Sequence, residues 1–305
     1  MNISSHNEWS RLRSVVVGRA DWANWPSTQP EYYREQLKTR WPHTPAPTGP
    51  VPAWIVDQVN HQLEQLCAVL VDWGCEVYRP LAHNHQWRDA FYSLCPRDRV
   101  LIVGEHVINC AMQYDRRTAE LEEMSFIQPT VTVPQHSWFD AANVMRCGRD
   151  VVYLVSVSGS PQGAEWLQQH LGNDYTVWPV ESVYQGTHID TTMIALNDHT
   201  VMINAGRMPR NRLPRFMQDW QIIEVSEDMI QPQGFYQYPQ GSKWMGLNVL
   251  SLDHQTVIVD RSQQPLIREL RGRHFEVIEL NLSHARTLGG GFHCVTLDLV
   301  RKDPE

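Results

Sequence analysis

The 305-residue sequence contains no apolar run near the roughly 20 residues that a membrane-spanning helix needs. Its opening residues, MNISSHNEWS, lack both the basic start and the apolar core of a signal peptide, and they are not an arginine-rich transit peptide. Positive charge is not in excess either: the formal net charge is −8, which argues against a nucleic-acid or anionic-membrane partner. A cytoplasmic enzyme that acts on small molecules is therefore the default expectation.

The six cysteines are scattered along the chain, and no two of them form a CxxC pair. Because no Cys/His pairs show the spacing of a structural zinc site, the sequence predicts neither a metal nor another cofactor. Five of the six lie in apolar patterns typical of reduced, buried thiols that act as small hydrophobes: Cys67, Cys75, Cys95, Cys110 and Cys147. Cys294 is the exception.

Cys294 ends the stretch LGGGFHC, residues 288–294, and precedes VTLDLV, which is typical of a buried strand. Three consecutive glycines give up backbone rigidity, and they are tolerated where the backbone turns through positive φ or a ligand approaches closely. Two alternatives follow for Cys294. It is a nucleophile presented by this turn, or it is a small core residue.

The same hairpin pattern recurs along the chain. Two apolar runs flank residues that accept turn dihedrals at four places, which are 104–105, 148–149, 197–198 and 253–254. The turns lie roughly 45 to 55 residues apart, a spacing that predicts repeated supersecondary units.

Helix-then-strand patterns separate these hairpins. The apolar spacing predicts helices over 52–74, 161–172, 213–220 and 264–272, and the first has a plausible C-cap at Gly74. A strand is predicted after each helix, over 75–80, 175–180, 221–226 and 275–280. The strands over 13–19 and 294–300 have no hairpin partner, so pairing between them would complete a fifth unit and close a ring.

Residues 21–54 interrupt the repeats of what we expect to be a single domain over 1–305. This insertion is rich in tryptophan and proline, and its five prolines between Pro42 and Pro52 predict an absence of regular structure there. The insertion is either a surface loop that packs its tryptophans on the body or a lid over a site.

Polar residues interrupt the apolar strands at equivalent places. Each of them lies at a strand start or a hairpin edge: Asp98, Asp140, His188, Asp190 and Cys294. In a ring of similar units, corresponding positions converge on the central axis. Three carboxylates, a histidine and a thiol would then meet in one pocket.

This set of groups favours one chemistry. A cysteine becomes a nucleophile when its thiolate is stabilised or a base is near, and a histidine oriented by a carboxylate shuttles protons near neutral pH. Two further carboxylates suit a planar cation, because they bind a guanidinium by paired, charge-assisted hydrogen bonds. The pattern indicates thiolate attack on a guanidinium carbon, although each aspartate taken alone is also typical of a turn or cap.

The chain resembles the amidinotransferase family, which includes L-arginine:glycine amidinotransferase and the inosamine-phosphate amidinotransferases of antibiotic biosynthesis. The resemblance runs nearly end to end, through NEWSRLRSVVVGRA, PRDRVLIVG, FDAANVMRCGRDV, GTHIDTTM, SKWMGLNVLSLD and LGGGFHC. It implies the α/β pentein fold, a five-bladed propeller with pseudo-fivefold ββαβ-type repeats, which agrees with the repeats in this sequence.

The resemblance also implies roles for individual residues. Cys294 would take the amidino group of L-arginine, and His188, oriented by Asp140, would protonate the departing amine and later deprotonate the acceptor amine. The reaction would be ping-pong transfer that releases ornithine.

Substrate contacts follow from the same resemblance. Asp98 and Asp190 would grip the guanidinium, Arg207 in NAGRMPR would meet the substrate α-carboxylate, and Ser242 in GSKW lies near a second carboxylate contact.

The chain departs from the vertebrate glycine enzyme in two places. The segment between CAMQYDRR and FDAAN is brief, and Gln185–Gly186–Thr187 before His188 differ. We therefore expect an acceptor amine in bacterial secondary metabolism at least as much as glycine. An arginine deiminase or dihydrolase, in which water replaces the acceptor, and a catalytically inactive binding protein are the alternatives, and a homodimer is possible.

Overall fold

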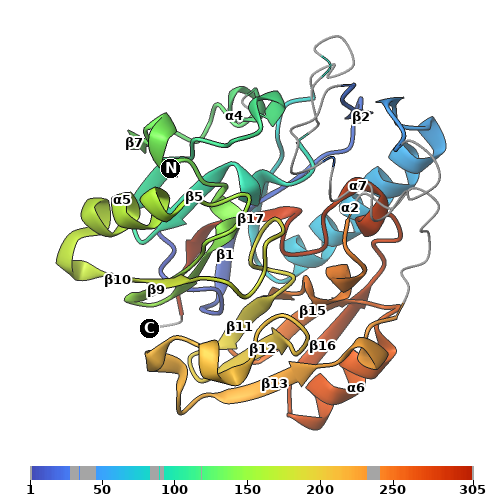
Figure 1. The fold of residues 1–305 in the computed structure, drawn as a ribbon. Coiled ribbons are helices and arrows are strands. Elements are labelled where there is room, and N and C mark those ends of the chain that lie inside the picture. Colours follow the sequence, from blue (N-terminus) through green and yellow to red (C-terminus); the bar gives the residue numbers. More distant parts are fainter. Residues whose placement is uncertain are drawn as a thin grey trace.

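The computed structural model describes residues 2–27, 46–82, 93–117, 119–231 and 241–303, together with positions 34 and 89. Within these residues, the strands form five three-stranded sheets and one two-stranded sheet (Figure 1). In every three-stranded sheet the central strand is antiparallel to one neighbour and parallel to the other. The chain is therefore built from one repeated unit.

Four of these sheets consist of strands that follow one another in the chain. The first two contain β5 (Val100–Val103), β6 (His106–Asn109), β7 (Val131–Thr132), β8 (Val144–Cys147), β9 (Asp150–Leu154) and β10 (Thr176–Val180). The next two contain β11 (Met193–Asn197), β12 (Thr200–Asn204), β13 (Gln221–Val225), β14 (Leu250–Ser251), β15 (Thr256–Asp260) and β16 (Glu276–Leu280). The four predicted hairpins are thus confirmed. The third turn comes one residue late, because an irregularity between Ala195 and Asn197 keeps Asn197 in β11.

The fifth sheet joins the two ends of the chain. Strand β1 (Leu12–Val17) lies between β17 (Thr296–Arg301), to which it is antiparallel, and β4 (Glu76–Tyr78), to which it is parallel. The predicted pairing of the terminal strands is therefore confirmed. The arrangement of the five sheets as a closed, five-bladed ring stays a prediction, as does the single domain.

Three longer helices lie at the periphery of the molecule, outside the strands: α2 (Ala53–Asp72), α5 (Pro161–Leu171) and α6 (Gln264–Gly272) (Figure 1). Helix α2 buries an apolar stripe that repeats every three or four residues and includes Ile55, Val59 and Leu63. It ends at Asp72, and the φ of +91° at Gly74 lets the amide of Cys75 reach back to the carbonyl of Leu70 at 2.8 Å. The predicted glycine stop is thus present, one residue after the cap residue Trp73.

The helix predicted over 213–220 is wrong. This segment forms only a 3-10 turn, η7 (Arg215–Met217), and its backbone bonds join residues three apart, such as Met217 N to Pro214 O at 2.9 Å. Its apolar residues have helical spacing, but the segment is too short to offset the cost of helix nucleation. Leu213, Phe216 and Trp220 instead pack against the hydrophobic cluster beneath.

The absence of regular structure predicted for the proline-rich run is also wrong at one point. Strand β3 (Gly49–Pro50) pairs with β2 (Asn24–Trp25). A two-stranded sheet has only edge strands, where a residue without an N–H is tolerated. Trp25 is buried, whereas Trp22 is exposed. Most of the residues between β2 and β3 lie outside the described residues, so the interpretation of the insertion as a loop or a lid stays a prediction.

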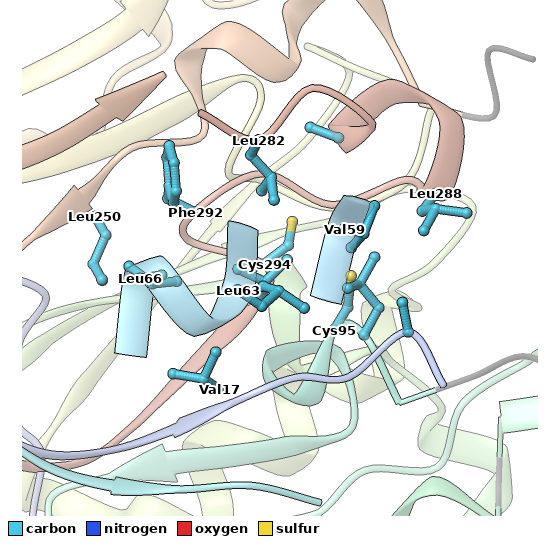
Figure 2. Packing of buried hydrophobic residues seen from close by; sticks show 14 of the residues in the cluster. Val17, Val59, Leu63, Leu66, Cys95, Leu250, Leu282, Leu288, Phe292 and Cys294 are labelled. Carbon is cyan, nitrogen blue, oxygen red and sulfur yellow. The ribbon is translucent and has the colours of Figure 1, made fainter. Parts of the chain in front are cut away.

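Cys294 borders the largest hydrophobic cluster of the molecule. Figure 2 shows it among Val59, Leu63, Phe292 and Cys95, so the thiol lies where α2 packs against the C-terminal loop. Cys294 is 2% exposed. No helix within the described ranges is both long and apolar enough to span a membrane.

Candidate active site

The residues predicted to converge come from the starts of different sheets. Asp98 ends the 3-10 turn η1 (Pro96–Asp98), which leads into β5, and Asp140 directly precedes the turn η4 (Ala141–Asn143), which leads into β8. His188 and Asp190 precede β11, and Cys294 lies two residues before β17. Because the sheets repeat one topology, equivalent positions in the chain come together in space.

His188 lies between two carboxylates. Its Nε2 is 3.0 Å from Oδ2 of Asp140, and its Nδ1 is 3.7 Å from Oδ1 of Asp98. Burial alone would lower the pKa of His188, but the two carboxylates outweigh burial and raise this pKa to about 9. The imidazole is therefore a cation near neutral pH and can act as an acid.

The backbone of His188 is unusual as well. Its φ is +64°, in the left-handed region that a histidine seldom adopts, and its amide donates to Oγ of Ser158 at 3.2 Å. Such strain persists only where the surrounding structure fixes it, and it is concentrated at functional sites.

Asp190 and Cys294 are in direct contact. The Sγ of Cys294 donates to Oδ2 of Asp190 at 3.1 Å, and the amide of Cys294 donates to Oδ1 of Asn248 at 2.9 Å. The contact with the thiol of Cys95, burial and the charge of Asp190 together raise the pKa of Cys294 well above its ordinary value. Without a ligand, Cys294 is therefore a neutral thiol.

The three glycines before Cys294 have two different functions. Gly289, at φ +82°, makes the left-handed turn that ends the short helix α7 (Ala285–Leu288). Gly290 and Gly291 provide space instead: a Cβ on Gly290 would clash with Sγ of Cys95, and one on Gly291 would lie 2.6 Å from Cβ of Asn248. The close approach predicted for this stretch is made by side chains of the protein itself.

Each of the three carboxylates has one oxygen in use and one without a donor. The Oδ2 atoms of Asp98, Asp140 and Asp190 are bound by Arg117 at 2.6 Å, His188 at 3.0 Å and His293 at 3.0 Å, respectively. None of the described residues donates a hydrogen bond to the three Oδ1 atoms, which are all buried. Leaving a buried acceptor unpaired costs about 1–3 kcal/mol. A ligand with several N–H donors would satisfy these atoms.

Arg207 and Ser242, predicted for the substrate carboxylate, are neighbours. One terminal nitrogen of Arg207 donates to Oγ of Ser242 at 3.0 Å, and the other donates to Oγ1 of Thr191 at 3.0 Å. The guanidinium also lies over the ring of Tyr184, at 3.8 Å from its centroid. Since Thr191 follows Asp190 directly, Arg207 is placed one residue away from the carboxylate that contacts Cys294.

Several residues of the site were not singled out from the sequence. Arg117 holds Asp98, Asn248 holds the backbone of Cys294, and the thiol of Cys95 lies beside that of Cys294. His293 is next to a predicted residue and Asn248 lies in SKWMGLNVLSLD, one of the stretches that carry the resemblance, but nothing in either stretch marks these side chains as part of the site. Among the described residues, no group of three or more His, Cys, Asp and Glu side chains could hold a metal ion.

The chain is 35% identical over 338 residues to inosamine-phosphate amidinotransferase 1 of Streptomyces griseus, and the match covers 98% of this chain and 97% of that protein. The chain belongs to the amidinotransferase family. It is also 27% identical to L-arginine:L-lysine amidinotransferase of Pseudomonas savastanoi pv. phaseolicola (98% and 94% covered) and 28% identical to mitochondrial glycine amidinotransferase of Xenopus tropicalis (98% and 83% covered). No protein-family model matches the chain.

Solved structures place this amidinotransferase in the α/β pentein fold. Inosamine-phosphate amidinotransferase StrB1 from Streptomyces griseus superimposes with a TM-score of 0.86 at 32% identity, covering 99% of this chain and 97% of that one. DDAH from Pseudomonas aeruginosa superimposes with a TM-score of 0.67 at 15% identity, covering 94% of this chain and 99% of that one, a likeness of fold alone. The amidinotransferase family and the α/β pentein fold expected from the sequence are therefore confirmed, whereas the five-bladed propeller stays a prediction.

Proposed function

We propose that this amidinotransferase moves the amidino group of L-arginine to an acceptor amine through an amidino-cysteine intermediate on Cys294, with ornithine as the first product. The observation that carries the proposal is the set of three buried carboxylate oxygens without donors, on Asp98, Asp140 and Asp190, beside a cationic His188. Anionic acceptors that lack donors fit a cation rich in N–H groups. The name of the relative L-arginine:L-lysine amidinotransferase supports arginine as the donor.

Arginine would contact this site through its guanidinium and through its α-carboxylate. Its guanidinium is planar and carries five N–H donors, so it would bridge the free oxygens of Asp98 and Asp190. Its α-carboxylate would meet Arg207 and Ser242, which contact each other at 3.0 Å. Binding two carboxylates to one guanidinium also compensates charges that are costly to bury alone.

In the first half-reaction, Sγ of Cys294 attacks the guanidinium carbon. The thiol first releases its proton to solvent as the substrate binds, because the adjoining positive charge of the guanidinium favours the thiolate. As the S–C bond forms, the bond from this carbon to Nε of arginine breaks, and His188 gives its proton to that nitrogen, which becomes Nδ of ornithine. Ornithine leaves, and the amidino group remains on Cys294.

In the second half-reaction, the acceptor amine replaces ornithine. His188, now neutral, takes a proton from the amine, whose nitrogen attacks the amidino carbon. The C–S bond breaks, and the thiolate of Cys294 is restored. The acceptors named for the relatives differ, and an amine of bacterial secondary metabolism is at least as good a candidate for this chain as glycine.

The test is to mix the protein with L-arginine alone, then with a panel of amines, and to quantify ornithine, citrulline and urea. We expect about one equivalent of ornithine per protein until an amine restores turnover. Cys294→Ala should release none. Continuous citrulline, or ornithine with urea, in the absence of an amine would refute transfer and establish a hydrolase. Stabilisation by arginine without any product would indicate a binding protein.

A further inference from the structure

His293 is a buried histidine that the mechanism above does not use. It lies next to Cys294 in the chain and is 4% exposed. Its Nδ1 is 3.0 Å from Oδ2 of Asp190, and its Nε2 is 3.3 Å from Oε2 of Glu8, so the ring bridges two buried carboxylates.

Both partners of this ring are carboxylates whose pKa values are lowered. Burial would raise the pKa of Asp190, but the hydrogen bond and charge of His293, together with His188, outweigh burial and lower this pKa to about 2. Burial would also raise the pKa of Glu8, but the positive charge of Arg146 outweighs burial and holds this pKa well below its usual range. Both carboxylates are therefore ionised and only accept hydrogen bonds. The two ring nitrogens of His293 therefore each face an ionised acceptor, one on Asp190 and one on Glu8.

The bridge determines how the carboxylate of Asp190 is turned. Its Oδ2 accepts from both Nδ1 of His293 and Sγ of Cys294, at 3.0 and 3.1 Å. A carboxylate held at one oxygen by two donors cannot rotate freely, and its other oxygen, Oδ1, keeps a fixed direction without a donor among the described residues. Glu8 is itself held by Arg146 through two hydrogen bonds of 2.8 and 2.6 Å, so the far end of the bridge is anchored.

We infer that His293 is a positioning residue for the guanidinium site. Its Nδ1–H turns Asp190 so that Oδ2 faces the thiol of Cys294 and Oδ1 faces the donor's guanidinium, and its Nε2–H anchors the ring on Glu8. This inference rests on the proposed function, in which Asp190 binds the guanidinium. His293 itself touches no reacting atom.

Two substitutions separate the two ends of the bridge. The amide nitrogen of asparagine occupies about the place of Nδ1, and that of glutamine occupies about the place of Nε2. His293→Asn therefore keeps a donor to Asp190 and loses the contact with Glu8. His293→Gln keeps a donor to Glu8 and loses the contact with Asp190. His284→Gln is the matched control, because His284 is also buried, at 1% exposed, and its Nε2 lies against Gln58.

The first measurement is the rate of the single ornithine burst with L-arginine alone, at increasing arginine concentration. We expect His293→Gln to lower the burst rate or raise the half-saturating arginine by roughly 10- to 100-fold, the effect of losing a hydrogen bond to a charged group. His293→Asn should stay within about fivefold of the wild type, since a neutral donor to Asp190 remains. Equal losses in both variants, in proportion to their melting temperatures and matched by His284→Gln, would mean a structural role and overturn the inference.

A second measurement does not depend on arginine as a substrate. Losing the donor to Asp190 leaves its charge less compensated beside Cys294, which raises the pKa of the thiol further. The rate of alkylation of Cys294 by iodoacetamide at pH 9, followed by mass spectrometry, should then be highest in wild type, lower in His293→Asn and lowest in His293→Gln. If wild type shows no ornithine burst, the proposed function fails, and this order still decides: equal alkylation rates would refute the positioning of Asp190 by His293.

Discussion

Replacing Asp140 by asparagine tests the electrostatics of His188 directly. The side chain keeps its shape, and its oxygen still accepts from Nε2 of His188, so the change removes a charge and little else. The carboxylate bound at 3.0 Å is one of three, with Asp98 and Asp190, that raise the pKa of His188 to about 9. Losing the charged part of this hydrogen bond costs about 1–3 kcal/mol, so the pKa should fall by about 1 to 2. The charge of Asp98, whose Oδ1 is 3.7 Å from Nδ1 of His188, still holds the pKa of His188 above its ordinary value.

The raised pKa of His188 in the wild-type protein also predicts that stability depends on pH. A histidine whose pKa is about 9 when folded and near 6.5 when unfolded contributes about 3 kcal/mol to the free energy of unfolding. Because the folded pKa is the higher one, this contribution is complete below pH 6.5 and is lost as the pH rises through about 9. In Asp140→Asn the loss between these limits should be about 1–3 kcal/mol smaller, since one pKa unit is worth about 1.4 kcal/mol.

Two assays measure these quantities. NMR titration of the His188 ring gives its pKa, and the signal is assigned from its absence in His188→Asn, a replacement suited to the φ of +64°. Urea unfolding at pH 6.5 and 9.5 gives the free energies, with His188→Asn as the reference for all other titrating groups. A pKa for His188 that is the same in Asp140→Asn and wild type would refute the reasoning, since the carboxylate would then contribute nothing.

Three further predictions concern the substrate, the glycine turn and the charged interior. Arg207→Gln should raise the half-saturating arginine of the ornithine burst roughly 10- to 100-fold and abolish the preference for arginine over agmatine, which lacks the α-carboxylate. Gly290→Ala should lower the free energy of unfolding by about 1–3 kcal/mol in a urea titration, because its Cβ meets Sγ of Cys95, and Cys95→Ala should restore most of the loss. Asp298→Asn should cost about 3–5 kcal/mol by the same assay, because it leaves three buried arginine side chains around a neutral amide.

The features predicted correctly from the sequence are those with a local cause. The turns at Gly104 and Gly148 have φ of +58° and +72°, conformations that glycine adopts without strain, and the flanking apolar runs determine the strands. The pairing of β1 with β17 was predicted because each lacked a hairpin partner. The segment 213–220 failed because helical spacing says nothing of whether the segment is long enough to be a helix.

The residues of the site also fall into those with a local sequence pattern and those without one. Asp98, Asp140, His188, Asp190 and Cys294 could be proposed because each interrupts an apolar strand pattern at its start. The bridge from Glu8 to His293 joins residues 285 positions apart, and no periodicity or spacing in the sequence relates them. Asn248 is similar, since its contact with Cys294 spans 46 positions. Contacts of this kind are decided by tertiary packing alone.

A cluster of buried charges lies beneath the site. It consists of Glu8, Arg97, Arg146, Asp298 and Arg301, and its carboxylates and guanidinium groups pair at 2.6 to 3.3 Å. All five side chains are almost fully buried. Removing one member of such a cluster leaves an uncompensated charge, at a cost of about 3–5 kcal/mol, so the cluster fixes the positions of the segments that supply it.

Two short motifs join this cluster to the site. In PRD, Arg97 enters the cluster while its neighbour Asp98 faces His188; in FHC, His293 contacts Glu8 of the cluster while its neighbour Cys294 faces Asp190. The Nε of Arg97 also donates to the backbone oxygen of His293 at 2.7 Å, which ties the two motifs to each other. In each motif, one residue is held by buried charge, and its neighbour is the one to which we assign a role in the proposed reaction. The separation of Asp98 and Cys294 is therefore set by the interior of the protein before any substrate binds.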